Sequence, residues 1–350
     1  MKWLTSLKGV AAAVSKAGGS MDRRELMGLA TAAAVTTPAL CDPAIADTMA
    51  ADGSLPGDSK EFVPLWPGTP PDGAGIALTL RQQDTVLRDG YHVRSVAMIQ
   101  TPGLIVYRPA KPNGLSLLIM PGGGYAFENV DLGGRDVAQH YSSIGITCFV
   151  LRYRLPAEGW QDRADVPLQD AQRAMRLIRS NAKFYGIDPA KVASIGFSAG
   201  GHLSASLATR FSAKVYDPVD ASDALNAKPI VVSLLYPVIT MQDGTHPGSR
   251  NKLLGSTPGA AALDAYSTER HVPADTPPTF ICLAADDPEA APFANGIAMF
   301  GALRAAKIPA ELHVFEVGGH GFGVHLAEGK PVGAWPDLFL AWAATHGFSA

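Results

Sequence analysis

Cysteine is scarce in this chain of 350 residues, with three copies. Cys41 lies near the N-terminus, whereas Cys148 and Cys282 each lie inside an apolar, strand-like run. A disulfide between the last two is one option in an oxidising compartment, but an unpaired cysteine packs well as a small hydrophobic residue. We therefore expect two separate buried thiols. Because the chain has neither a C-x-x-C motif nor a histidine pair at i, i+4, we expect no metal and no organic cofactor.

A large excess of one charge is also lacking. The chain has 29 Lys and Arg against 32 Asp and Glu, a formal net charge of −3, which gives no electrostatic reason to expect nucleic acid as a partner. It contains no internal repeat and no run of 18 apolar residues suited to stable membrane insertion. With 47% hydrophobic residues, the chain has enough apolar material for one large α/β domain.

The first 46 residues have the layout of a bacterial twin-arginine export signal. An Arg-Arg pair at positions 23–24 precedes an Ala-rich, mildly apolar stretch at 29–35, and an A-x-A-like cleavage site ends at Ala46. Such a signal would begin at Met21, so either Met1 or Met21 is the true start. We expect the twin-arginine export machinery to be a partner and the protein to be periplasmic or secreted. The alternative is an Ala-rich leader with a chance Arg-Arg pair.

Residues 47–79 are rich in Gly, Pro, Asp and Ser, which predicts a flexible leader ahead of a domain at 80–350. Two antiparallel strand candidates follow at 93–99 and 103–107, joined by Gln-Thr-Pro. Short apolar runs then alternate with helical segments, and these strand candidates span 115–120, 146–151, 192–197, 230–236, 279–285 and 311–317. Apolar runs that do not alternate with polar residues are typical of strands buried on both faces of a parallel sheet.

Helical periodicity is clearest after Pro167, which suits the first turn of a helix. Apolar residues recur there at three- and four-residue spacing until Gly186 ends the pattern, and a similar helix is expected over 294–306. Repeated β-α alternation favours a doubly wound, mostly parallel α/β sheet with antiparallel N-terminal strands. Residues 239–275 lack this alternation and predict a loop or small cap over the carboxyl edge of the sheet.

Residues 196–200 read Gly-Phe-Ser-Ala-Gly and lie where a strand-like run meets a helix-like one. In a G-x-S-x-G elbow the serine occupies a strained turn, and the two glycines avoid side chains that would collide there. Such a turn exposes the hydroxyl beside backbone N–H groups at a helix N-terminus, as an acyl-transfer nucleophile requires. Ser198 is therefore the candidate nucleophile. The alternative is a connection rich in small residues with no chemical role.

A serine hydroxyl needs a base to remove its proton, and the base needs a third group to orient it. His320 lies in the glycine-rich segment 318–323, directly after the last strand candidate. Asp286 and Asp287 end the preceding strand candidate, and the order Ser, Asp, His is that of α/β-hydrolases. We favour Asp287 as the acid because an Asp-Pro step suits the turn. Asp286 is the alternative acid, or it caps the turn by accepting backbone N–H bonds.

The segment 121–125 reads Pro-Gly-Gly-Gly-Tyr and follows the strand candidate 115–120. Glycines let backbone N–H groups approach a developing negative charge closely. We assign this oxyanion hole to the amides of Gly123, Gly124 and Ala199. A phosphate loop is disfavoured because the G-K-[ST] ending is missing, and a merely flexible loop is the remaining alternative.

Together these motifs resemble those of α/β-hydrolase esterases. More narrowly, the chain resembles the bacterial acetyl esterase/lipase group that includes acetyl xylan esterases and related carbohydrate esterases. The resemblance covers residues 80–346, and its motifs lie at 121–125, 150–156, 170–174, 196–202, 236–238, 286–288 and 318–323. It implies Ser198 as nucleophile, His320 as base and Asp287 as its partner. It also implies removal of acetyl or similar short acyl groups from plant polysaccharide or small esters.

The expected substrate is thus a small-molecule or carbohydrate ester, cleaved in a two-step acyl transfer. Tyr125, Glu128 and Tyr236 are expected to line the acyl or alcohol side of the pocket, or else to be packing residues. Three other functions compete with the acetyl esterase. They are a general carboxylesterase or lipase, a peptidase of the prolyl-oligopeptidase type, and a catalytically silent binding protein. Peptidases of that type usually carry a propeller-sized N-terminal domain.

Overall fold

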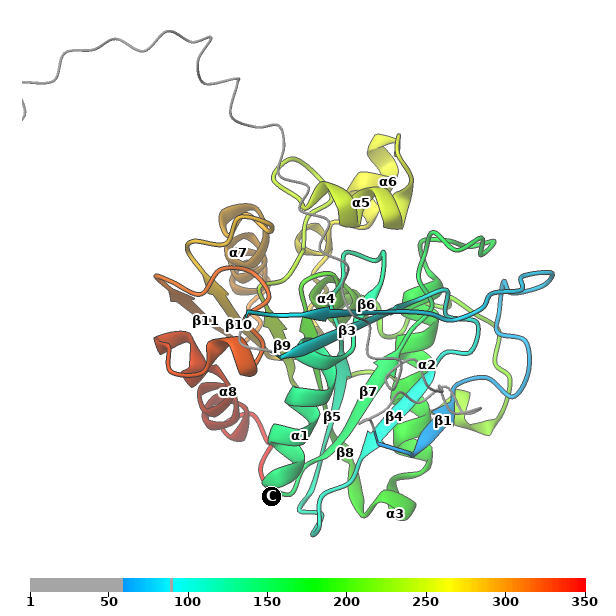
Figure 1. Ribbon diagram of the computed structural model, residues 1–350, viewed down its shortest axis with the longest axis horizontal. Helices are drawn as coiled ribbons and strands as arrows, with labels where there is room; N and C mark the ends of the chain where they lie inside the picture. The colour runs from blue at the N-terminus through cyan, green and yellow to red at the C-terminus, as the bar shows by residue number, and fades with distance from the viewer. Residues whose placement is uncertain (1–58, 89–90) are drawn as a thin grey trace, which may run out of the picture. The chain divides into compact units, whose positions relative to one another are not determined.

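The computed structural model describes residues 59–88 and 91–350. The expected export signal at 1–46 and the first part of the leader lie outside the described residues and stay predictions. The central element is an eight-stranded sheet with the strand order β1-β4-β7-β5-β8-β9-β10-β11 (Figure 1).

Six neighbouring strands of this sheet are parallel, as the apolar runs predict. They are β5 (Gly114–Met120), β7 (Thr147–Arg152), β8 (Ile187–Phe197), β9 (Val232–Leu235), β10 (Thr279–Ala284) and β11 (Ala310–Phe315). Two antiparallel strands, β4 (Gly103–Tyr107) and β1 (Phe62–Pro64), extend the sheet beyond β7. The doubly wound, mostly parallel sheet with antiparallel N-terminal strands is therefore confirmed.

A second sheet has three antiparallel strands, β2 (Arg81–Val86), β3 (His92–Ala97) and β6 (Glu128–Asn129). The expected pairing of the strand candidates 93–99 and 103–107 is wrong, because β3 and β4 belong to different sheets. The chain leaves β3 at Met98, which has a φ of 61°. The backbone N–H groups of Met98 and Ile99 donate to the Glu158 carboxylate, so the connection is held away from a hairpin turn.

The leader expected at 47–79 needs a correction for its described part. Phe62–Pro64 forms β1 and pairs with β4, and Leu65 and Trp66 are buried. The Trp66 indole N–H donates to the buried Asp170 carboxylate at 2.8 Å. The folded domain therefore begins ahead of residue 80. A three-residue strand inside a Gly- and Pro-rich stretch leaves too short a pattern to be recognised from composition.

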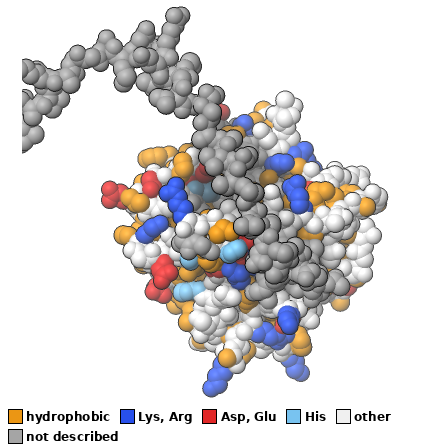
Figure 2. Space-filling view, in the orientation of Figure 1, with side chains coloured by type: hydrophobic (Ala, Val, Ile, Leu, Met, Phe, Trp, Pro, Cys, Tyr) orange, Lys and Arg blue, Asp and Glu red, His pale blue; other side chains and the backbone are white. Residues whose placement is uncertain are grey.

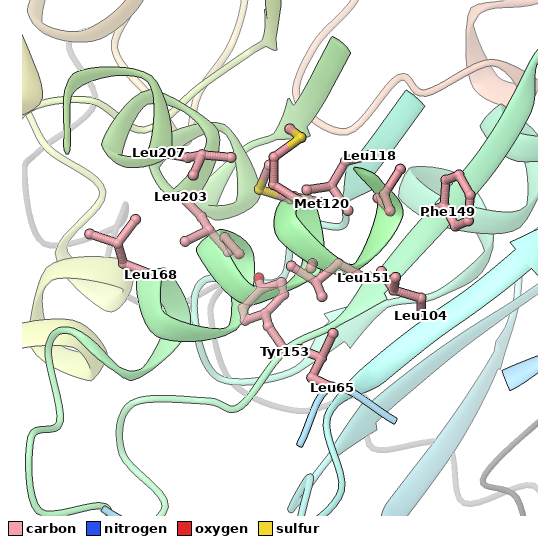
Figure 3. Packing of buried hydrophobic residues seen from close by; sticks show 14 of the residues in the cluster. Leu65, Leu104, Leu118, Met120, Phe149, Leu151, Tyr153, Leu168, Leu203 and Leu207 are labelled. Atoms are coloured by element: carbon pink, nitrogen blue, oxygen red, sulfur yellow. The ribbon is translucent and has the colours of Figure 1, made fainter. Parts of the chain in front are cut away.

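Alternate residues of each strand face opposite sides of the sheet, and helices cover both sides. On one face, Leu118 and Met120 of β5 pack with Leu203 and Leu207 of α4 (Figure 3). That face is covered by α2 (Val166–Ser180), α4 (Ala199–Arg210) and α7 (Ala298–Ala305), and the opposite face by α1 (Asp136–Ser143) and α8 (Trp335–Ala344).

The two cysteines of the described chain are free and buried, which confirms the expectation of separate thiols. Cys148 lies on β7 and Cys282 on β10, in the apolar cluster beneath α1 and α8. Burial raises the pKa of Cys282 to about 12, so this thiol is a packing group and not a reactive thiolate.

The helix expected after Pro167 is confirmed as α2, with Pro167 in its first turn. It is followed by the short α3 (Ala182–Tyr185), which ends at Gly186 in the left-handed conformation. The helix expected at 294–306 begins with a π-helical turn before α7. The structure also contains short helical segments of two kinds. The π-helical ones are Asp131–Arg135 and Phe293–Ile297, and the 3-10 ones are Ala221–Ala224, Thr268–Arg270, His325–Ala327 and Pro331–Ala334.

The segment 239–275 folds as a small cap that contains α5 (Pro247–Leu254) and α6 (Ala260–Ala265) (Figure 1). Residues of α5 line a cavity above the carboxyl ends of the strands, as the prediction requires. Acidic and basic side chains both occur on the face drawn in Figure 2. Within residues 59–88 and 91–350, no helix has the length and hydropathy needed to cross a membrane.

Candidate active site

Ser198 occupies a sharp turn between the end of β8 and the start of α4. Its φ and ψ are 53° and −118°, outside the regions that a residue with a side chain normally adopts. A Cβ at Gly196 would lie 2.2 Å from the Gly200 carbonyl oxygen, and one at Gly200 would lie 2.2 Å from that of Met120. The elbow geometry expected from the two glycines is therefore present, and its backbone strain is on the order of 1–3 kcal/mol.

The fold brings the predicted histidine and one aspartate to this serine. His320 Nε2 lies 2.8 Å from Ser198 Oγ, and His320 Nδ1 lies 2.8 Å from Asp287 Oδ2. With a proton on Nδ1 donated to the carboxylate, Nε2 has a free lone pair that faces the serine hydroxyl. This arrangement is suited to remove the Ser198 proton during attack on an acyl carbon.

The two neighbouring aspartates have separate partners. Asp287 is buried, and its second oxygen accepts the N–H groups of Glu289 and Ala290 at 2.8 and 3.0 Å. Asp286 instead accepts the N–H groups of Gly318 and Gly319, at 2.9 and 2.7 Å, and does not contact His320. The bonds from Gly319 and Gly318 lower the pKa of the Asp286 carboxyl. Asp286 thus supports the loop that presents the histidine, which is its alternative role.

The glycine loop, residues 121–125, lies beside the elbow. A Cβ at Gly122 would lie 2.8 Å from the Phe197 carbonyl oxygen, and one at Gly123 would lie 2.0 Å from that of Phe127. No described residue accepts a hydrogen bond from the N–H of Gly123 or Gly124. The N–H of Ala199, as the first residue of α4, has no acceptor within its helix. The amides of Gly123, Gly124 and Ala199 are therefore unused donors in the loop and the elbow, and their role as an oxyanion hole stays a prediction.

Ser198 and His320 open into a cavity of about 1200 Å³. Apolar side chains line part of it, among them Phe127, Leu132, Phe197 and Tyr236. Polar and charged residues also line it, from the cap and from the loop after β10, with His246, Asn251, Lys252, Ser256, Asp286 and Glu289 among them. The cavity therefore has both apolar lining, with Phe197 and Tyr236 next to Ser198 and His320, and polar lining from the cap.

Of the three expected pocket residues, only Tyr236 lines the cavity. Its ring lies edge-on to His320, with centroids 4.9 Å apart. Tyr125 and Glu128 are buried outside the lining, so of the two expected roles they take that of packing residues and not that of pocket residues. A positive φ at Tyr125 turns its side chain toward His202 of α4. Glu128 accepts the N–H of Tyr153 at 2.6 Å, and burial raises its pKa well above the usual range.

Several lining residues come from segments that show no motif. His246 Nε2 lies 3.3 Å from the Glu289 carboxylate, and its Nδ1 accepts from Ser249 and caps α5. Arg163 donates to the carbonyl oxygens of Asn251 and Lys252 at the end of α5, which ties the cap to the loop before α2. A helix cap followed by Pro247 is the one local signal that could have located α5.

No metal site accompanies this cavity in the part of the chain that is described. Among residues 59–88 and 91–350, no group of three or more His, Cys, Asp or Glu side chains is arranged to hold a metal ion.

A model of the α/β hydrolase fold family matches residues 117–324, more than half of the chain. The chain belongs to this family. The matched range contains the glycine loop, the elbow serine, both aspartates and His320.

Relatives of this α/β hydrolase include named xylan-degrading enzymes. It is 37% identical over 208 residues to endo-1,4-beta-xylanase B of Butyrivibrio fibrisolvens, a match that covers 59% of this chain and 32% of that protein. It is 33% identical over 224 residues to an acetylxylan esterase of Xylanibacter ruminicola, covering 63% of this chain and 43% of that protein. The chain thus spans less than half the length of either curated relative.

A similar solved structure matches a larger share of this chain than the curated relatives do. The α/β hydrolase is similar to the acetyl ester-xyloside bifunctional hydrolase of Caldicellulosiruptor lactoaceticus, with a TM-score of 0.68 and 30% sequence identity. That match covers 84% of this chain and 98% of the other.

Proposed function

We propose that this α/β hydrolase is a serine esterase that removes acetyl or similarly short acyl groups from carbohydrate, with acetylated xylan as the leading substrate. The observation that carries the proposal is the pair of 2.8 Å contacts that connect Ser198, His320 and Asp287 at the cavity. The names of the curated relatives and of the similar solved structure support an acyl ester of xylan as substrate.

In the first step Ser198 Oγ attacks the ester carbonyl carbon while His320 Nε2 takes the serine proton. The carbonyl oxygen becomes an oxyanion and accepts hydrogen bonds from the amides of Gly123, Gly124 and Ala199. Asp287 holds the imidazolium through Nδ1. When the tetrahedral intermediate collapses, the bond to the sugar oxygen breaks, and this oxygen takes the proton from Nε2.

In the second step a water molecule attacks the acyl group on Ser198. His320 Nε2 takes a proton from this water, and the same amides stabilise the second oxyanion. Collapse then breaks the bond to Oγ, which regains its proton from His320. Acetate leaves, and the serine is regenerated.

The walls of the cavity support a short acyl group on a polar alcohol. Phe197 and Tyr236, beside Ser198 and His320, give this part of the cavity an apolar surface suited to a methyl group. The cap side offers His246, Asn251 and Lys252, whose donors suit the hydroxyl groups of a sugar.

A general carboxylesterase is the second candidate, and the size of the cavity favours it. About 1200 Å³ is more space than a single acetylated pentose fills, since ligand cavities of roughly 300–1000 Å³ hold drug-sized molecules. Acetate release from acetylated xylan, compared with hydrolysis of 4-nitrophenyl butyrate and octanoate, separates the two. An acetyl esterase hydrolyses the longer esters poorly, whereas a general carboxylesterase prefers at least one of them.

Ser198→Ala tests the nucleophile. Without Oγ, acetate release should fall on the order of 10⁶-fold, while the circular-dichroism spectrum stays that of the folded protein. Ser204→Ala is the matched control, because Ser204 is buried in the same helix and its hydroxyl contacts Ser194 and not the cavity. The nucleophile is wrongly assigned if folded Ser198→Ala keeps its activity, or if both variants lose it equally.

We also infer export through the twin-arginine machinery from residues 1–46. Replacing both Arg23 and Arg24 by Lys should leave the protein in the cytoplasmic fraction of an expressing bacterium, whereas the unchanged chain should reach the periplasm. Equal distribution of the two forms would contradict an export signal at this place.

A further inference from the structure

Tyr125 ends the glycine loop in a backbone conformation that costs free energy. Gly123, Gly124 and Tyr125 have φ angles of 137°, 63° and 57° in succession. Glycine adopts positive φ readily, but for a bulky aromatic residue it is an outlier. Such a residue persists only where its surroundings over-determine its position. A strong contact must therefore hold Tyr125 in place.

That contact is with a buried histidine of α4. Tyr125 is 1% exposed, and its hydroxyl lies 2.8 Å from Nδ1 of His202, which is also 1% exposed. The other ring nitrogen, Nε2, lies 2.8 Å from the backbone carbonyl oxygen of Tyr266 at the end of α6. His202 thus bridges the glycine loop, the helix that begins beside Ser198, and the cap.

The partners of His202 determine where its proton lies. A carbonyl oxygen can only accept a hydrogen bond, so Nε2 carries a proton toward Tyr266. Burial lowers the pKa of His202 to about 4, so the ring is neutral near neutral pH and Nδ1 is an acceptor. The Tyr125 hydroxyl therefore donates to Nδ1. Each hydrogen bond of the bridge has one defined direction.

The cap end of the bridge is fixed as well. The Tyr266 hydroxyl donates to Asp165 at 3.0 Å, and Asp165 pairs with Arg210 of α4 at 2.8 Å. The Arg210 guanidinium also lies over the Tyr266 ring, 5.3 Å from its centroid. Tyr266 is therefore attached to α4 at two places, through His202 and through Arg210. Its carbonyl oxygen is a stationary anchor for the histidine.

We propose that Tyr125, His202 and the Tyr266 carbonyl form a positioning bridge that holds the amides of Gly123 and Gly124 where the oxyanion develops. The inference rests on the proposed esterase function. His202 lies outside the cavity lining and acts only through the loop. Because the amides matter more to the transition state than to the bound ester, loosening the loop should lower kcat more than it changes KM.

Three variants separate the contacts of the bridge. Tyr125→Phe removes the donated hydrogen bond and keeps the ring. His202→Asn keeps an acceptor for Tyr125 but no longer reaches Tyr266, and His202→Leu loses both bonds. We expect kcat for 4-nitrophenyl acetate to fall roughly tenfold or more in Tyr125→Phe and His202→Leu, with KM within about twofold of wild type. His202→Asn should retain more activity than His202→Leu.

Tyr141→Phe is the matched control, because Tyr141 is a fully buried tyrosine under the opposite face of the sheet whose hydroxyl donates to the Pro336 carbonyl oxygen. It should keep the wild-type kcat. Circular dichroism and Tm show whether each variant is folded. Folded Tyr125→Phe and His202→Leu with wild-type kcat would overturn the bridge, as would an equal loss of kcat in Tyr141→Phe.

A second measurement tests the hydrogen bonds of the bridge without using enzymatic activity. It therefore remains informative even if the protein hydrolyses no ester. Nitrogen-15 NMR of the histidine rings should show His202 as the neutral Nε2–H form near neutral pH, and Tyr125→Phe should shift its Nδ1 signal. An imidazolium or an Nδ1–H form at that pH would overturn the bridge. A wild-type protein that shows the Nε2–H form but hydrolyses no ester would instead overturn the proposed function alone.

Discussion

At the scale of single residues, Asp286 and Asp287 stand next to each other and have different tasks. Asp287 accepts from His320 Nδ1, whereas Asp286 accepts two backbone N–H groups of the histidine loop. In Asp287→Asn the amide can donate to Nδ1, which would favour the wrong histidine tautomer. We expect kcat for 4-nitrophenyl acetate to fall on the order of 10³–10⁴-fold.

Asp286→Asn is the matched control for this prediction. Its amide oxygen can still accept both backbone N–H groups, so kcat should change only by about threefold or less. A larger loss in Asp286→Asn than in Asp287→Asn would show that the acid is Asp286 and that the contact with Asp287 does not govern the histidine.

The buried His202 makes the stability of the protein depend on pH. Burial lowers its pKa to about 4 in the folded state, whereas an exposed histidine has a pKa of about 6.5. Between these values the unfolded chain binds a proton that the folded protein does not. This contribution to the free energy of unfolding is complete above about pH 6.5 and declines by roughly 1.4 kcal/mol per pH unit down to about pH 4.

Urea unfolding of the wild type and His202→Asn near pH 7 and near pH 5 measures this contribution. The wild type is expected to be the more stable protein near neutral pH, and its advantage should shrink by about 1–2 kcal/mol at the lower pH. An advantage that is constant or grows on acidification would contradict a neutral, buried His202.

Residues whose place depends on a short motif were predictable at this scale, and residues placed by a distant partner were not. Ser198 and His320 have glycines around them that predict their exposure. Tyr125 ends the glycine loop and Glu128 follows soon after it, yet neither side chain lines the cavity. Their partners are His202 and Tyr153, 77 and 25 residues farther along the chain. No local pattern reveals such pairs.

At the scale of elements, the elbow depends on close contact between α4 and the end of β5. In Gly200→Ala the new Cβ would lie 2.2 and 2.4 Å from the carbonyl oxygens of Met120 and Pro121. Relieving this clash would require the backbone to shift, so the free energy of unfolding should fall by about 1–3 kcal/mol or more. Esterase activity should fall with it, because α4 carries the Ala199 amide. Thermal unfolding and kcat measure the two effects.

Gly301→Ala is the matched helix variant, because Gly301 lies in α7 and a Cβ there would meet nothing within 4 Å. It should be neutral or raise stability by about 0.5–1 kcal/mol, since alanine favours a helix over glycine. Equal behaviour of the two alanine variants would contradict the close approach of α4 to β5.

Buried elements were easier to predict than the elements over the cavity. Strands such as β7 and β10 are buried along their whole length and mostly apolar because both faces are covered, and this pattern marks them in the sequence. The helices of the cap are short, and α5 has only two buried residues, Ser249 and Leu253. Contacts from Arg163 and His246 hold this helix in place. The spacing of its apolar residues therefore does not mark it as a helix in the sequence.

At the scale of the whole molecule, the segment before residue 80 belongs to the folded domain. Trp66 packs in the same cluster as Tyr153 and Leu168 and donates to Asp170, which in turn pairs with Arg154. Trp66→Ala would leave a cavity and an unmade buried hydrogen bond. We expect the free energy of unfolding to fall by about 3–5 kcal/mol.

Lys60→Ala serves as the control, because this exposed residue precedes β1 and its change should leave Tm within about a degree of the wild type. If Trp66→Ala were as stable as Lys60→Ala, the segment would be a leader after all. The mostly parallel arrangement of the main sheet follows from β-α alternation in the sequence. The position of β1 at its edge depends instead on pairing with β4, 41 residues farther on, and composition cannot reveal it.

The central claim is that Ser198 forms the bond to the acyl group. The most direct test is to treat the folded protein with a fluorophosphonate and to locate the phosphonyl group by peptide mass spectrometry. We expect Ser198 to carry the group, label and acetate-releasing activity to change in proportion, and Ser198→Ala not to be labelled. A label on another residue, with Ser198 unmodified and activity lost, would contradict it.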